Sequence, residues 1–90
     1  MKEFILIVNY RNTIANGYRD QRTESCEIED LAMIIRDAES ADNNGDVKNV
    51  TIQVLNDGKY IGNLDFVEMS LEKERYGELE QIEESELIYI

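Results

Sequence analysis

The chain has no histidine, no proline and no tryptophan, and only one cysteine and five glycines in 90 residues. Without histidine, the Ser-His and Cys-His pairs of nucleophilic catalysis cannot form within the chain. The single cysteine, Cys26, allows no intramolecular disulfide, and it falls short of a zinc site, which needs several Cys or His ligands. These absences exclude the commonest catalytic schemes and predict a reducing, cytoplasmic setting.

Long apolar runs are also missing. No stretch approaches the roughly 18 apolar residues of a membrane-spanning helix. The run Phe4–Val8 is too short and too poorly flanked for a signal peptide. We therefore expect a cytoplasmic protein with no membrane partner.

Motifs for phosphate or metal binding are lacking too. No glycine-rich stretch precedes a helix in the manner of a phosphate-binding loop. Residues 42–46 resemble the start of a calcium loop, but Val47 stands where glycine is needed and Gln53 where a bidentate glutamate is needed. We expect no cofactor and no resident metal, with adventitious cation binding at this turn as the alternative. Carboxylate pairs arise by chance among twenty acids, so we also predict that the protein is not an enzyme.

Negative charge is what the chain has in excess. Twenty Asp and Glu against nine Lys and Arg give a formal net charge of −11. The excess is uneven, since residues 1–25 sum to +1 and residues 26–90 to −12. Such a surface repels nucleic acid and anionic membranes and attracts basic surfaces. A solubility role alone is the alternative explanation.

The apolar pattern predicts two strands and then a helix. Residues 4–10 are apolar on both strand faces, which is typical of a central strand covered on both sides. The signal Asn16-Gly17 predicts a turn, after which residues 18–24 form a partly exposed strand. A helix over 26–41 follows, with Ser25 as its N-cap and with Ile28, Leu31 and Ile35 on one face.

Residues 50–55 and 59–66 predict a hairpin around Asn56-Asp57-Gly58. A three-residue loop with Gly58 at positive φ would place Val54 opposite Tyr60, Ile52 opposite Gly62 and Val50 opposite Leu64. A two-residue Asp57-Gly58 loop would place Ile52 opposite Asn63. We prefer the first register because it keeps one face apolar.

From Ser70 the spacing of Tyr76, Leu79 and Ile82 predicts an acidic helix, although Gly77 weakens that prediction. Residues 87–90 form either a last short strand or a plug, and the C-terminal segment is expected to cover Ile5 and Ile7. The chain is thus predicted to be a single α+β domain over residues 1–90. Its antiparallel sheet has about four strands in the order β-β-α-β-β-α, with one well-defined helix on one face and an acidic C-terminal helix or irregular segment.

The acidic positions are the candidate site. Carboxylates along a helix can present an array comparable to duplex DNA, which carries one charge per roughly 1.7 Å of axis. We expect a basic protein surface as the partner, namely that of a nucleic-acid-binding protein, and no direct binding of nucleic acid. The residues expected to bind the partner are Glu29, Asp30, Asp37, Glu72, Glu74, Glu78, Glu80, Glu83 and Glu84.

In size, acidity and lack of catalytic residues the chain is similar to small phage-encoded inhibitors of host defence, including anti-CRISPR proteins. No motif carries the similarity, so it assigns no residue. The alternative function is a small regulatory or assembly subunit that binds a protein partner, or a second copy of itself, through apolar strand faces. Ile5, Ile7 and residues 87–90 would make that contact.

Overall fold

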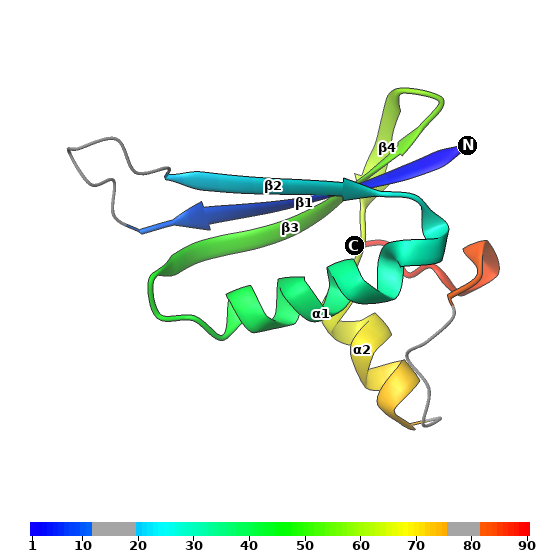
Figure 1. The fold of residues 1–90 in the computed structure, drawn as a ribbon. Helices are drawn as coiled ribbons and strands as arrows, with labels where there is room; N and C mark the ends of the chain where they lie inside the picture. The colour runs from blue at the N-terminus through cyan, green and yellow to red at the C-terminus, as the bar shows by residue number, and fades with distance from the viewer. Residues whose placement is uncertain (12–19, 76–81) are drawn as a thin grey trace.

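A computed structural model describes residues 1–11, 20–75 and 82–90 of the chain (Figure 1). A four-stranded antiparallel sheet in the order β2-β1-β3-β4 carries helices α1 and α2, which confirms the predicted α+β class. The elements are β1 (Lys2–Tyr10), β2 (Gln21–Cys26), the 3-10 helix η1 (Ile28–Asp30), α1 (Leu31–Asp42), β3 (Val47–Asn56), β4 (Lys59–Asn63), α2 (Phe66–Arg75) and the 3-10 helix η2 (Glu84–Glu86). The predicted turn at Asn16-Gly17 lies outside the described residues.

Strand β1 is central, as predicted, because β2 pairs on one side of it and β3 on the other. Its apolar side chains alternate between the two faces of the sheet. Phe4, Leu6 and Val8 are fully buried in the core, whereas Ile5 and Ile7 on the opposite face are only partly buried. One face of the sheet therefore carries the whole core.

Within the described residues, the expected cover on the second side of this strand is not seen. In Figure 1, α1 and α2 lie on the same side of the sheet, and no described helix lies on the other. The described C-terminal residues do not support the expected cover of Ile5 and Ile7, because Leu87 and Ile88 pack against the core on the helix side. A run that is apolar on both faces cannot by itself reveal which face a helix will cover.

Helix α1 supplies the core's second layer. Leu31, Ile35 and Ala38 are fully buried at helical spacing, while Met33 on the outer face is 61% exposed. The predicted start is wrong. Ser25 is not the N-cap, because β2 continues to Cys26 and only the short η1 precedes the helix. Ile28 in η1 still packs against the core, as its spacing indicated.

The β3–β4 hairpin forms, but with a different register from the one preferred. Asp57 (φ 51°) and Gly58 (φ 83°) make a two-residue turn with two positive φ angles, the geometry that suits the twist of a hairpin. Leu55 pairs with Tyr60 and Val54 with Gly62, which leaves Ile61 as an extra residue in a bulge.

The bulge removes the reason for rejecting the two-residue turn. Beyond it, the Leu64 backbone N–H donates to the Ile52 carbonyl at 2.8 Å, and both side chains are buried. The apolar face is therefore preserved by one inserted residue rather than by a longer loop.

Helix α2 begins earlier than predicted. Asp65 caps it, since its side chain accepts a hydrogen bond from the Glu68 backbone at 3.0 Å and its carbonyl accepts the first helical bond from Met69. Phe66, expected at a strand end, is the first helical residue and is buried. Residues 76–81 of the predicted helix lie outside the described residues. Leu64 forms a bridge with Tyr89, so residues 87–90 both extend the sheet locally and pack on the core.

Truncation of Leu31 to Ala should lower the free energy of unfolding by about 2–5 kcal/mol, because the side chain is fully buried between α1 and the sheet. Met33→Ala on the same helix is the control and should change it by less than about 0.5 kcal/mol. Urea denaturation followed by circular dichroism measures both. Equal effects would contradict the placement of α1.

Gly58→Ala should destabilise the protein by about 1 kcal/mol, because an L side chain disfavours the left-handed region that Gly58 occupies. Gly45→Ala is the matched control, since a Cβ at either position meets no atom within 4 Å and Gly45 does not have positive φ. Thermal unfolding compares the two variants. A larger loss for Gly45→Ala would show that the turn conformation is not what matters.

Candidate partner-binding surface

The described strand residues that the pairing register assigns to the face opposite the helices are almost free of charge. Strand alternation and the pairing register place thirteen side chains on it. These residues are Glu3, Ile5, Ile7, Asn9, Gln21, Thr23, Ser25, Asn49, Thr51, Gln53, Leu55, Tyr60 and Asn63. Glu3 is the one charged residue among them, in a chain with 29 charged residues. We call these thirteen residues the open face.

Hydrogen bonds tie the polar side chains of the open face to one another. Gln21 Nε2 donates to Asn9 Oδ1 at 2.9 Å, and Asn9 Nδ2 donates to Asn49 Oδ1 at 2.7 Å, so one row of amides crosses three strands. The Tyr60 hydroxyl donates to Asn63 Oδ1 at 2.8 Å on β4. These contacts fix the side chains of the open face in place without using charge.

The predicted acids lie in the helical segments instead. Glu29 and Asp30 are exposed in η1, and Asp37 is half-buried on α1. Burial is the main cause of the raised pKa of Cys26 at the end of β2. The negative charges of Asp30, Glu24, Glu29 and Glu3 raise it further, so these acids lie near the thiol. The pKa of the Arg22 guanidinium is raised mainly by its hydrogen bond to Tyr10, and the negative charge of Asp37 raises it further. The structure thus places this group of predicted acids along the side of the molecule where β2 meets α1.

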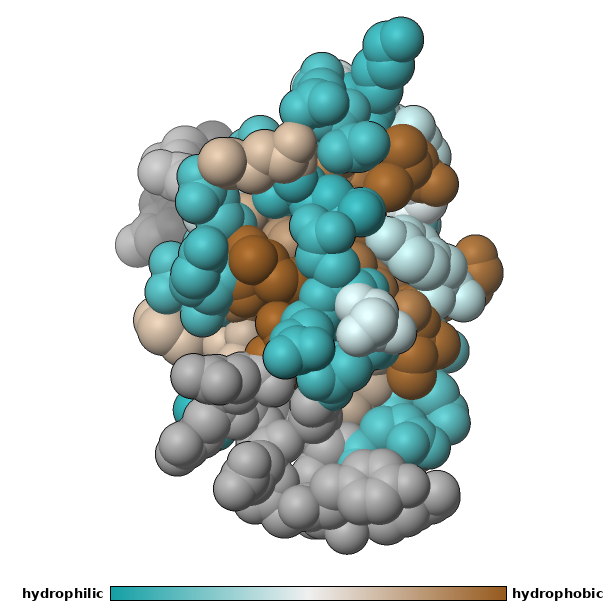
Figure 2. Space-filling view, turned by 90° about the vertical axis from the view of Figure 1, so that its right-hand side faces the viewer, coloured by the Kyte–Doolittle hydropathy of each residue, from teal (hydrophilic) through white to brown (hydrophobic). Residues whose placement is uncertain are grey.

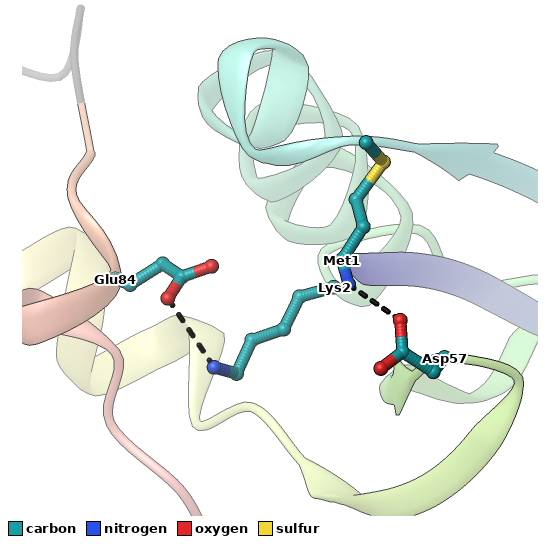
Figure 3. A network of polar contacts seen from close by, with 4 residues as sticks. All are labelled: Met1, Lys2, Asp57 and Glu84. Carbon is teal, nitrogen blue, oxygen red and sulfur yellow. Dashed lines mark hydrogen bonds and ion pairs between the residues drawn. The ribbon is translucent and has the colours of Figure 1, made fainter.

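A second group of predicted acids is anchored at the end of the sheet (Figure 3). Glu83 and Glu84 are exposed, and the Glu84 carboxylate forms an ion pair with Lys2 Nζ at 3.4 Å. The side chain of Lys2 is only 23% exposed, so this contact ties η2 to β1. Beside it the amino group of Met1 contacts Asp57 Oδ1 at 2.6 Å, and this hydrogen bond lowers the pKa of Asp57.

The remaining predicted residues belong to the segment around α2. Glu72 lies on α2 and is half-buried. Glu74 belongs to the same helix, while Glu78 and Glu80 lie outside the described residues. The structure therefore places six of the nine predicted side chains, in two groups on the helix side and on α2, and none on the open face.

The exposed apolar residues form small groups, one of them where Tyr89 and Ile90 lie beside the end of β4. Figure 2 shows a band of hydrophilic residues with separate hydrophobic patches beside it, at the end of the molecule that carries the two termini. The most exposed large apolar residues come from several elements: Met1, Met33, Tyr60, Ile61, Val67, Leu71, Tyr89 and Ile90. No large apolar surface is visible in that view.

A shallow groove of about 520 Å³ opens at the same end of the sheet, between the start of β1, the end of β2 and the hairpin turn. Cys26 lines it. Burial, followed by the nearby carboxylates, raises the pKa of the Cys26 thiol to about 11. The groove therefore holds a protonated thiol and not a nucleophilic thiolate at neutral pH.

Two further observations concern binding in general. Within residues 1–11, 20–75 and 82–90, no three Cys, Asp or Glu side chains are grouped closely enough to hold a metal ion. Among the helices of that same described part, none is long and apolar enough to cross a membrane. Comparison of the chain with protein families, with curated proteins and with solved structures gave no match.

Sequence reasoning missed the open face. The signal was present, because the positions that alternate with the core residues of β3 are Asn49, Thr51 and Gln53, all polar and uncharged. Charge counts along the chain do not reveal it, since the register of four strands is needed to bring such residues together.

Cys26 should react slowly with iodoacetamide at pH 8, on the order of 100-fold more slowly than in the urea-unfolded chain, because its raised pKa reduces the thiolate fraction. The rate should climb as the pH approaches about 11, the pKa of the folded thiol. Mass spectrometry of alkylated protein follows both rates. Fast alkylation of the folded protein would mean that the thiolate is stabilised, contrary to the effect of its acidic neighbours.

Proposed function

We propose that the protein is a non-enzymatic acidic inhibitor that occupies the basic nucleic-acid-binding site of a partner protein by charge mimicry. The observation that carries the proposal is the segregation of charge. The described acids of η1, α1 and η2 sit on helical segments, whereas the open face carries only Glu3. A charged array on one part of a surface is what recognition of a basic groove requires.

Two features indicate that carboxylates of the acidic surface are held in place by neighbouring residues rather than freely solvated. Glu84 is held by an ion pair with Lys2. The hydrogen bond that Arg22 donates to Tyr10, followed by the charges of Glu24 and Asp37, raises the pKa of Arg22, so these two carboxylates lie close to it. Carboxylates fixed on a folded scaffold lose less conformational entropy on binding than carboxylates of a flexible tail. The proposal includes a cytoplasmic site of action and no direct contact with nucleic acid.

The partner class follows from size and charge. A basic channel of a nuclease, polymerase or repressor suits a compact acidic chain of 90 residues. Within that class we place the protein with phage-type inhibitors of host defence nucleases, of which anti-CRISPR proteins are one kind. The similarity is one of physical character.

The test starts from the immobilised chain and a bacterial lysate. Nucleic-acid-binding proteins should be retained and should elute as salt rises, because exposed charges are screened over about 8 Å at physiological ionic strength. The free chain should then displace labelled DNA or RNA from each eluted protein in a filter-binding assay. Retained proteins that keep their nucleic acid would contradict the proposal.

Charge-neutral variants sharpen the test. Glu29→Gln, Asp37→Asn and Glu83→Gln together should weaken inhibition about tenfold, as expected for the loss of three ion pairs with the partner of about 0.5 kcal/mol each. The control variant, Glu3→Gln with Asp20→Asn and Asp57→Asn, loses the same charge at the open face and the sheet ends. It should inhibit as the original does. An equal loss of inhibition in the two triple variants would show that inhibition depends only on net charge.

A second function, that of an assembly subunit, is favoured by one observation. Ile5, Ile7 and Leu55 are only partly buried on the open face, which no described helix covers. A complex that survives high salt and is lost in Ile5→Ser/Ile7→Ser would support this function and would replace the inhibitor.

A further inference from the structure

Strand β2 forms one edge of the sheet, and no described strand pairs with its outer side. The opposite edge is partly occupied, since Tyr89 bridges Leu64 next to β4. An edge strand presents unpaired backbone N–H and C=O groups to any strand of complementary sequence. The question is which residues of β2 present them.

The backbone hydrogen bonds between β1 and β2 show which residues of β2 point outward. The Tyr10 N–H donates to the Asp20 carbonyl at 2.8 Å, so the residues of β2 whose backbone bonds to β1 are Asp20 and every second residue after it. Bonds from Asp57 to Met1 and from Leu64 to Ile52 follow the same alternation across the sheet.

The backbone groups of Gln21, Thr23 and Ser25 consequently point away from β1. Within the described part of the chain, nothing donates to them or accepts from them. Their side chains lie on the open face and are uncharged, whereas Arg22 and Glu24 lie on the helix side.

We infer that β2 pairs antiparallel with β2 of a second copy of this chain, with Thr23 of each copy on the two-fold axis. In this register Thr23 faces Thr23, and Gln21 faces Ser25, which allows about six backbone hydrogen bonds. Arg22 then lies opposite Glu24 of the second copy, twice, in non-hydrogen-bonded pairs where Cβ atoms approach to about 4.5–5.5 Å.

Charge selects this register over its neighbours. The outward groups fall on alternate residues, so the next allowed registers are shifted to put Arg22 opposite Arg22 or Glu24 opposite Glu24. Like charges directly opposite each other on a sheet are destabilising. Only the register centred on Thr23 places both Arg22 and Glu24 opposite a residue of the other sign. An isologous two-fold contact needs such self-complementarity.

The state of Glu24 in one chain supports the contact. Arg22 Nη1 lies 3.2 Å from Glu24 Oε2, with the two side chains 37% and 39% exposed. The buried Glu24 Oε2 atom accepts no hydrogen bond within the described residues. The Glu24 side chain as a whole is 39% exposed, so its carboxylate is open to the approach of Arg22 from a second copy. The paired sheets would also join two open faces into one surface on which the two copies of Glu3 are the only charged open-face residues, with both acidic helix layers on the other side.

This contact is independent of the proposed function and is tested on the purified chain alone. Sedimentation velocity at physiological ionic strength should show a reversible monomer–dimer equilibrium between about 10 µM and 1 mM, as expected for an interface at the small end of the size range. A monomer throughout that range would overturn the inference.

Thr23→Pro isolates the backbone contribution. The backbone N–H of Thr23 points outward, so proline at this position removes no hydrogen bond to β1. Edge strands tolerate proline in such positions. The variant should keep the circular dichroism spectrum of the original, and its dimer dissociation constant should rise at least tenfold. Thr23→Val, which keeps the N–H, should still dimerise. A folded Thr23→Pro variant that dimerises normally would exclude β2.

A charge swap tests the register and does not depend on the proline variant. Arg22→Glu and Glu24→Arg should each weaken the dimer at least tenfold, because each places like charges opposite one another. The double variant restores opposite charges at both positions and should recover the dimer. Failure of the double variant to recover while folded, or undiminished dimers in both single variants, would contradict the Thr23-centred register.

Discussion

The packing of one helix on one face of the sheet is the interaction on which the rest of the structure depends. Phe4, Leu6 and Val8 from β1 meet Leu31 and Ile35 of α1, and all five side chains are fully buried. Burying apolar area from water is the main favourable term for a domain of this size, and a single modest core is what 90 residues can supply. With the core on one side, the other face of the sheet carries mostly uncharged side chains, and the described acids of the candidate site lie on or beside the helical segments.

The sequence predicted the parts of the fold that local patterns encode. Alternation in β1 and β3, helical spacing of Leu31 and Ile35, and the Asp57-Gly58 turn signal each identified an element correctly. The register of β4 failed because it depends on a bulge at Ile61, which no local pattern marks. The start of α2 could have been found from Asp65 and Glu68, whose spacing is typical of a capped helix end.

The site was less predictable than the fold, for a physical reason. Acids such as Glu29 and Asp37 were identified by composition, but their relation to Arg22 and Cys26 arises from the packing of α1 beside β2. The open face depends even more on long-range pairing, because its residues come from four strands. The low charge of the open face is therefore a property of the sheet register, which the uneven charge along the linear sequence does not reveal.

One-sided charge is the central claim, and nuclear magnetic resonance can test it directly. An oligoarginine peptide titrated into the ¹⁵N-labelled protein at physiological ionic strength serves as a basic probe of defined chemistry. The account predicts amide shift changes centred on Glu29, Asp37 and Glu83, with Thr51 and Gln53 of the open face unchanged. Equal shift changes on both faces of the sheet would contradict it.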